Sequence, residues 1–487
     1  MHRLAAVLAV LLAAAAFAGG ASAALRVGVA EDIGLAAEHT PWFFESLGEL
    51  GMSENRISVA FDPADPTTIQ NQAALDSYMP LATLRGVRVV FSVAPTKARA
   101  ITGTPRGAAL FASYVELLAR RYPTVKDYII GNEPNQNRFW QPQFNRAGRN
   151  VSAASYYPML AASYDALKAI DPTIVVVGVG LSPRGGDDPK APNNVSTSPV
   201  RFLHALGKAY RASRRNRPIM DELAFHPYPD RDTDPLMKGY RWPNAGVPNL
   251  GRIKQAFWDA FRGTAQPVFP EGRSARGLKF RLDELGWQVA VHPSAANAYF
   301  GFENVRPTNE ASQSRIYADS IRYLACDASV SSVLFFLLQD EPNLERWQAG
   351  LVRADGTRRP SFHAVKAALA QTSGRCQGAM RSWRHTTRVE RARVRWPRQR
   401  TLPARQLTLA PVLNAEEDAR VEAGLYTAAG KPVVRQRAVV KAYRSKIVRL
   451  SKRLRPGRYV LRVKFRAELN SARTSRFSTP IVITGRR

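Results

Sequence analysis

Cysteine is nearly absent from this sequence: the 487 residues contain two, Cys326 and Cys376. Neither has an adjacent histidine, so the pair does not match a metal-binding motif. We expect the two cysteines to form a single disulfide, which would close a loop of about 50 residues. A disulfide of this kind persists in the oxidising compartments reached by exported proteins.

Long apolar runs are missing after the N-terminus, so no later segment is expected to span a membrane. The apolar run at residues 4–17 follows a short basic start and precedes Ala21-Ser22-Ala23, a small-residue cleavage site. It is shorter than the roughly 20 residues that a transmembrane helix needs. We predict a signal peptide at residues 1–23 and an extracytoplasmic protein, either secreted or associated with the cell surface. The alternative is a retained membrane anchor.

Acidic residues are few: 39 Asp and Glu stand against 70 Lys and Arg, which gives a formal net charge of +31. From Gln377 onward, 28 Lys and Arg stand against 6 Asp and Glu, so this part supplies +22 of the total. Such a field attracts polyanions. No nucleic-acid-binding motif is visible, so specific nucleic-acid binding is disfavoured. Anionic cell-wall polymers, acidic polysaccharides or anionic membrane surfaces are the expected partners; a general preference for arginine is the alternative explanation.

Short apolar runs alternate with helical patterns through most of the chain. The runs are Arg26–Ala30, Arg56–Phe61, Val87–Val93, Tyr128–Asn132, Ile174–Val179, Glu222–His226, Lys279–Glu284 and Ser332–Leu338. The clearest helical patterns are Pro41–Gly51, Gly107–Arg121, Ala153–Ile170, Pro199–Ser213, Leu250–Gly263, Asn309–Cys326 and Ser361–Gln371. Eight such units predict a (β/α)₈ TIM barrel at residues 24–374. No glycine-rich phosphate loop follows the first run, which disfavours a dinucleotide-binding fold.

The character of the chain changes after Gly374, where long helical patterns stop and short alternating strands begin. In the strand after Gly457, apolar and basic residues alternate, as in a sheet with one buried face. We predict a basic linker at residues 375–405 and a small basic β-sandwich accessory domain at 406–487. The sandwich is expected to be immunoglobulin-like, although the Cys…Trp…Cys signature is missing.

Two glutamates end predicted barrel strands. Glu133 follows the fourth strand and is followed at once by Pro134, which ends strand pairing. Glu284 ends the seventh strand beside Asp283, and we expect these neighbours to point to opposite faces of that strand. Strand ends on the C-terminal side are where barrels place catalytic groups. Two carboxylates converging there fit glycosidic cleavage, with one as acid/base and the other as nucleophile or base. The structural alternative is that Asn132 caps the next helix.

The loops that follow the fourth, sixth, seventh and eighth strands are long and rich in aromatic residues. Long loops on this side of a barrel build active sites, and flat rings there can stack on sugars. Trp140 and Trp287 are the candidate substrate-binding tryptophans; packing within the loops is the alternative.

On these motifs the barrel resembles the clan A glycoside hydrolases, most closely family 39 and family 5 members. The resemblance covers residues 25 to about 374 and lies in Gly131-Asn132-Glu133-Pro134-Asn135 and Asp283-Glu284-Leu285-Gly286-Trp287. It implies that Glu133 is the acid/base and Glu284 the nucleophile of a retaining, double-displacement glycosidase. It implies no metal and no organic cofactor.

The resemblance also implies substrate-binding and supporting roles for four residues. Asn132 would contact a sugar 2-hydroxyl, and Arg56 would support the nucleophile. His226 and Tyr228 match a His-x-Tyr element after strand six. The eighth strand departs from the pattern, because it ends without the expected tryptophan unless Trp347 folds back. The third also departs, since it ends without the histidine common in family 5.

The sequence therefore predicts an exported retaining glycoside hydrolase that acts on a poly- or oligosaccharide. The alternative from another class is a non-catalytic glycan-binding or cell-wall-associated barrel protein. The presence of both Glu133 and Glu284 favours the enzyme, because a degenerate site would most easily lose one of them.

Overall fold

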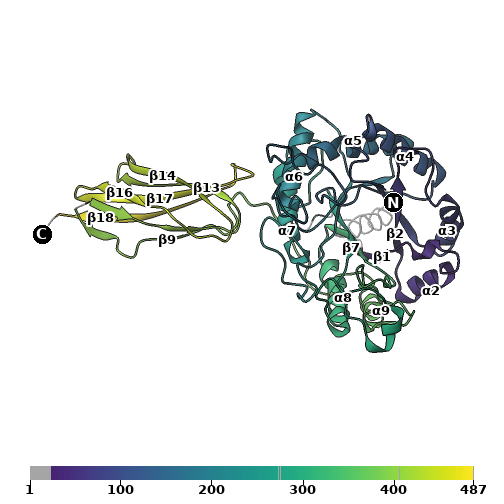
Figure 1. Cartoon of the computed structure of the whole chain (residues 1–487). Helices are drawn as coiled ribbons and strands as arrows, with labels where there is room; N and C mark the ends of the chain where they lie inside the picture. Colours follow the sequence, from purple (N-terminus) through teal and green to yellow (C-terminus); the bar gives the residue numbers. More distant parts are fainter. Residues whose placement is uncertain (1–23, 273, 275, 405, 486–487) are drawn as a thin grey trace, which may run out of the picture. The chain divides into compact units, whose positions relative to one another are not determined.

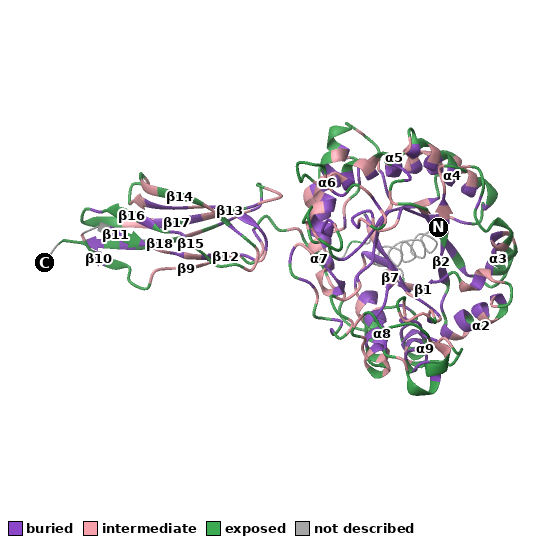
Figure 2. Cartoon of the chain, in the orientation of Figure 1, coloured by how far each residue is buried: buried purple, intermediate pink, exposed green. Residues whose placement is uncertain are grey.

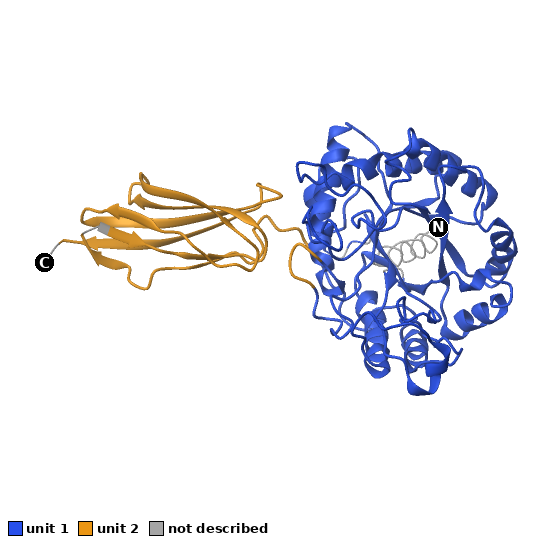
Figure 3. Cartoon of the chain, in the orientation of Figure 1, with its two compact units in different colours: residues 1–239, 245–383 blue, residues 240–244, 384–487 orange. Residues whose placement is uncertain are grey.

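The computed structural model describes residues 24–272, 274, 276–404 and 406–485. The predicted signal peptide lies outside these residues. The chain divides into two compact units, the first comprising residues up to Gly239 together with Ala245–Trp383. The second comprises Tyr240–Asn244 and Arg384–Arg487 (Figure 3). Within the described ranges, no helix is long and apolar enough to cross a membrane.

The first unit contains a closed barrel of eight parallel strands in sequence order (Figure 1). Strand β8 closes the barrel by pairing with β1, from Arg26↔Ser332 to Val29↔Phe335. This architecture confirms the predicted (β/α)₈ barrel. The strands are β1 Arg26–Ala30, β2 Glu54–Phe61, β3 Arg88–Pro95, β4 Asp127–Ile130, β5 Val175–Leu181, β6 Glu222–Phe225, β7 Lys279–Leu285 and β8 Val330–Phe335.

Helices surround the barrel, with their inner sides buried and their outer sides exposed (Figure 2). Helix α8 shows why the sequence forms them: the Asn309 side chain accepts a hydrogen bond from Ser312 N–H, and Glu310 lies in the first turn. Helix α3 was not among the clearest sequence patterns. The helices are α2 Thr40–Leu50, α3 Gln72–Leu84, α4 Gly107–Arg121, α5 Ser152–Ile170, α6 Pro199–Ala212, α7 Leu250–Phe261, α8 Glu310–Ala325 and α9 Pro360–Thr372, with short 3₁₀ helices η1 Ile33–Leu35, η2 Val247–Asn249 and η3 Pro293–Ala298.

A buried ionic cluster joins four barrel strands. The fully buried Arg281 guanidinium on β7 donates to Glu54 on β2 at 2.5 Å and to Asp127 on β4 at 2.6 Å. It also donates to Glu222 on β6 at 2.8 Å. Because charges are costly to bury unpaired, this arrangement requires all its members.

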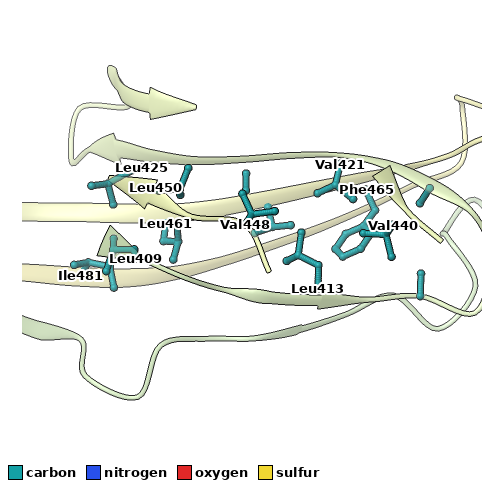
Figure 4. Close-up of a cluster of buried hydrophobic side chains, with 14 of the residues drawn as sticks. Leu409, Leu413, Val421, Leu425, Val440, Val448, Leu450, Leu461, Phe465 and Ile481 are labelled. Atoms are coloured by element: carbon teal, nitrogen blue, oxygen red, sulfur yellow. The ribbon is translucent and has the colours of Figure 1, made fainter. Parts of the chain in front are cut away.

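The second unit is a β-sandwich, as predicted. One layer is a five-stranded sheet in the order β10-β18-β17-β13-β14. The other layer consists of the two-stranded sheet β11-β16 and the three-stranded sheet β15-β12-β9. Figure 4 shows the apolar side chains that fill the space between the layers, including Leu413, Leu461 and Phe465. The strands are β9 Arg393–Arg395, β10 Thr401–Pro403, β11 Gln406–Leu409, β12 Val412–Asn414, β13 Ala419–Thr427, β14 Pro432–Val440, β15 Lys446–Ile447, β16 Leu450–Arg453, β17 Gly457–Ala467 and β18 Thr474–Thr484.

The segment between barrel and sandwich differs from the predicted linker at 375–405. Residues from Arg384 belong to the second unit, and strands β9 and β10 form within the predicted linker. Strands of three residues are too short to show a periodic pattern, so the sequence did not reveal them. Cys326 and Cys376 form the predicted disulfide within the first unit.

Candidate active site

Glu133 lies in a strained turn directly after β4. The strand ends at Ile130, earlier than the predicted Asn132, because Gly131 has a φ of 85° and turns the chain out of the sheet. Glu133 itself has a φ of 39°, which is uncommon for a residue with a side chain, and its N–H donates to Gly180 O at 2.8 Å. Strain of this kind costs about 1–3 kcal/mol, persists where the surroundings fix it, and clusters at active sites.

The end of β7 brings two carboxylates to one cation. Arg56 Nη1 lies 3.0 Å from Glu284 Oε1, and Arg56 Nε lies 3.3 Å from Asp283 Oδ2. The expectation that Asp283 and Glu284 point to opposite faces is therefore wrong. The pairing of β7 with β8 shifts register between Leu282 and Leu285, and such a bulge interrupts strand alternation.

Arg56 links the ends of several strands. Its side chain on β2 is almost fully buried, and Nη2 donates to Ser92 Oγ on β3 at 2.9 Å and to Asn132 Oδ1 at 3.2 Å. Burial opposes the charge on Arg56, but the Glu284 and Asp283 carboxylates outweigh it and raise the pKa of the guanidinium. A permanent positive charge is thus fixed beside Glu284.

His226 lies between three carboxylates. Its Nδ1 is 3.1 Å from Glu133 Oε1 and 3.4 Å from Glu284 Oε2, while Nε2 is 3.2 Å from Asp283 Oδ2. The Glu133 and Glu284 oxygens that face this nitrogen therefore lie at most about 6.5 Å apart, the sum of the first two distances. Burial lowers the pKa of the imidazole, but Glu284 and Asp283 outweigh burial and raise it well above its usual value. His226 is consequently a charged donor.

Tyr228 completes the contacts of Glu284. Its hydroxyl donates to Glu284 Oε2 at 2.8 Å. Burial, together with the Glu284 charge, raises the pKa of the phenol well above its usual value, so Tyr228 keeps its proton and remains a donor. The two oxygens of Glu284 thus face Arg56 on one side and Tyr228 on the other.

Accessibility separates the three carboxylates. The side chain of Glu133 is 15% exposed and that of Glu284 is 12% exposed, whereas Asp283 is fully buried. His226 and Arg56 lower the pKa of Asp283 against the opposing effect of burial, so this group is a buried anion. Only Glu133 and Glu284 among the three can meet a ligand.

Two aromatic side chains, Phe336 and Trp347, lie next to Tyr228. The centre of the Tyr228 ring is 6.2 Å from that of Phe336, which follows β8, and 4.9 Å from that of Trp347. Trp347 does fold back, as the sequence left open, since its ring lies 5.4 Å from Phe336. The sequence analysis did not select Phe336, although its position at the end of the eighth strand could have indicated a place near the site. It also missed Asp283 as a member of the site.

Trp140 and Trp287, predicted to contact substrate, are buried side chains of the barrel unit. Trp140 Nε1–H donates to Ser155 Oγ at 2.8 Å, and Trp287 Nε1–H donates to Asp234 O at 2.9 Å. Their exposed fractions are 2% and 1%, so neither offers a ring face to a sugar. The prediction is wrong for both, because each indole finds an internal acceptor that allows full burial. Over the described ranges, no group of His, Cys, Asp and Glu side chains is arranged to hold a metal ion.

No protein-family model and no curated protein matches the sequence. Among solved structures, the chain is similar to a family 39 glycoside hydrolase from Bacteroides cellulosilyticus WH2, with 15% identity, a TM-score of 0.48, and coverage of 88% of this chain and 81% of that chain. It is also similar to a glucosidase from Croceicoccus marinus, with 12% identity, a TM-score of 0.45, and coverage of 89% and 94%. A β-glucuronidase from Bacteroides uniformis is 13% identical, with a TM-score of 0.44 and coverage of 96% and 46%. These TM-scores lie below 0.5, so we infer function from the site itself.

Proposed function

We propose that this protein is an exported retaining glycoside hydrolase that cleaves O-glycosidic bonds of a poly- or oligosaccharide. The observation that carries the proposal is the pair of accessible carboxylates, Glu133 and Glu284, whose facing oxygens lie within about 6.5 Å at the C-terminal end of the barrel. Retaining enzymes place their carboxyl groups about 5–5.5 Å apart, whereas inverting enzymes leave about 6.5–9.5 Å for a water molecule.

In the first step, Glu284 attacks the anomeric carbon and forms an ester bond to the sugar. The bond between that carbon and the leaving oxygen breaks, and Glu133 gives its proton to this oxygen. Arg56 and Tyr228 hold the Glu284 carboxyl group in one orientation through contacts at 3.0 and 2.8 Å. Asp283 is excluded as nucleophile because its side chain is fully buried.

In the second step, Glu133 takes a proton from water, and the water oxygen attacks the anomeric carbon and releases Glu284. Asn132 supports the sugar during both steps in this proposal. Its amide oxygen accepts from Arg56, which turns the amide nitrogen to serve as the donor toward a sugar hydroxyl. The rings of Phe336 and Trp347 contact Tyr228, whose hydroxyl donates to Glu284. Their place beside the carboxylates suits the apolar face of a sugar ring.

The contacts of Glu133 support its assignment as the acid. Its side chain is accessible, whereas Asp283 is fully buried and Glu284 is held by Arg56 and Tyr228. His226 orients the Glu133 carboxyl through its 3.1 Å contact.

Azide rescue tests these roles. Glu284→Ala should abolish hydrolysis of activated aryl glycosides, and added azide should restore turnover by replacing the missing carboxylate as nucleophile. Glu133→Gln should slow substrates with poor leaving groups far more than those with good ones, because good leaving groups need little protonation. Glu303→Ala, which changes an exposed glutamate on the loop after β7, is the matched control and should keep wild-type activity.

A panel of nitrophenyl glycosides and polysaccharides identifies the sugar. If no substrate is hydrolysed and glycans are nevertheless bound, the protein is the non-catalytic glycan-binding barrel that the sequence left as its alternative.

Export is part of the proposal and is supported by the N-terminal sequence pattern and by the Cys326–Cys376 disulfide. Mass spectrometry of the protein purified from its native host should find a mature N-terminus near Ala24. An uncleaved chain in the cytoplasm would contradict it.

A further inference from the structure

The five-stranded sheet of the second unit uses one face for its core and leaves the other to solvent. Along β17, Leu461, Val463 and Phe465 are buried, while Arg462 and Arg466 between and beyond them are exposed. Figure 4 shows the buried side chains pointing into the space between the two layers. The side chains of β13, β14, β17 and β18 that alternate with this core form the opposite side of the sheet, here called the outer face.

The outer face is strongly cationic. Register places Lys464 opposite Arg476 of β18 and opposite Glu422 of β13, which in turn pairs with Arg437 of β14. The next row pairs Arg462 with Gly424, and Gly424 with Arg435. The cations that share this face are Arg420, Arg435, Arg437, Arg458, Arg462, Lys464, Arg466 and Arg476.

Glu422 is the one acidic residue on the outer face among the described residues. It lies 3.9 Å from Arg437. Among the residues that the structure describes, no carboxylate of this face forms an ion pair with its other cations. Partial burial, followed by the charges of Arg466 and Arg476, lowers the pKa of Lys464. Like charges on neighbouring strands destabilise a sheet, so folding does not explain this arrangement.

Other acidic residues of the second unit lie outside the outer face and pair with cations there. Glu417 pairs with Arg473, Asp418 with Lys441 and Glu416 with Arg391. A preference for arginine throughout the chain does not explain the pattern either. Residues 1–376 hold the remaining 42 Lys and Arg together with 33 Asp and Glu, a far more balanced mixture than the 28 against 6 that follow.

We propose that the outer face binds a linear polyanionic polysaccharide. Its cations repeat at about 7 Å along a strand and about 5 Å between strands, which suits many contacts to an extended chain of anionic groups. Tyr426 is the one aromatic ring on the described part of the face and already lies under Arg462 at 4.9 Å. Single-stranded nucleic acid needs successive aromatic platforms, so this face suits a polysaccharide better.

The choice of a polysaccharide over other polyanions rests on the proposed function of the barrel. Binding to the outer face would hold the enzyme on a polymer while the barrel site acts. Binding is measured without turnover, so a loss of polymer binding contradicts only the role of the outer face. A lack of hydrolysis contradicts only the proposed function of the barrel.

The test uses the full chain carrying Glu133→Gln, so that no cleavage changes the polymer, and polygalacturonate as the probe. Four cations of the outer face are changed in one variant, R435Q/R462Q/K464Q/R476Q. The matched control, R393Q/R395Q/R444Q/R449Q, removes the same charge from exposed arginines of the same unit outside this face. Circular dichroism and thermal unfolding establish that both variants fold.

We expect the parent chain to bind polygalacturonate with an affinity that falls steeply with salt, since counterions are released on binding. The outer-face variant should bind at least tenfold more weakly and with a shallower salt dependence, whereas the control should stay within about threefold of the parent. Equal weakening in both variants would show that total charge decides and would overturn the proposal. Absence of binding, or tighter binding to duplex DNA or to vesicles of phosphatidylglycerol, would also overturn it.

Discussion

Replacing Arg281 with methionine should strongly destabilise the barrel. Arg281 contacts Glu54, Asp127 and Glu222 within 2.8 Å, and all four side chains are at least 88% buried. Methionine fills most of the volume but leaves three carboxylates close together without their shared cation. Removing one partner of a buried ion pair costs about 3–5 kcal/mol, and we expect the free energy of unfolding to fall by that amount near pH 7.

Chemical unfolding of both proteins at several pH values measures this loss. Arg88→Met is the matched control: Arg88 also contacts Asp127, at 2.6 Å, but its side chain is 42% exposed, so the cost should stay below about 1 kcal/mol. The deficit of Arg281→Met should shrink as pH falls towards 4, because protonation removes the repulsion among its carboxylates. A deficit under 1 kcal/mol, or one independent of pH, would refute this electrostatic reasoning.

Three further outcomes are expected. Tyr228→Phe removes the 2.8 Å hydrogen bond to Glu284 and should lower kcat/KM on an aryl glycoside about 10- to 100-fold. This range corresponds to a hydrogen bond to a charged group, which is worth about 1.5–3 kcal/mol. An unchanged kcat/KM would contradict the role of this hydroxyl. Burial raises the pKa of Glu31 from 4.5 to about 7, so the folded state binds its proton more tightly than the unfolded state. The free energy of unfolding of wild type relative to Glu31→Gln should therefore fall by roughly 3 kcal/mol as pH rises from about 4.5 to 7, and a flat difference would count against it. Reducing the Cys326–Cys376 disulfide, whose residues are 50 apart, should cost about 4 kcal/mol in denaturant unfolding, and identical curves with and without reductant would disprove the effect.

The barrel was predictable because its strands are apolar on both faces and its helices show a clear period. Glu133 and Glu284 were predictable from position alone: each follows a buried run at the C-terminal side. Arg56 and His226 needed a family resemblance, since a single strand residue does not reveal which way it faces across the barrel.

Other features of the site depend on local geometry that the sequence pattern does not encode. A bulge in β7 turns Asp283 and Glu284 to the same cation, where simple alternation predicts opposite faces. The indoles of Trp140 and Trp287 find internal acceptors and become buried, although their loops suggested exposed platforms. The partners of Arg281 come from three other strands, so the sequence showed isolated charges where the fold makes one cluster.

The stereochemistry of the first released sugar tests the central claim most directly. Once a cleaved substrate is found, NMR can follow the anomeric proton of the product before mutarotation. Double displacement through Glu284 predicts that this product keeps the anomeric configuration of the substrate. Release of the inverted anomer by the wild-type enzyme would contradict the assignment of Glu284 as nucleophile.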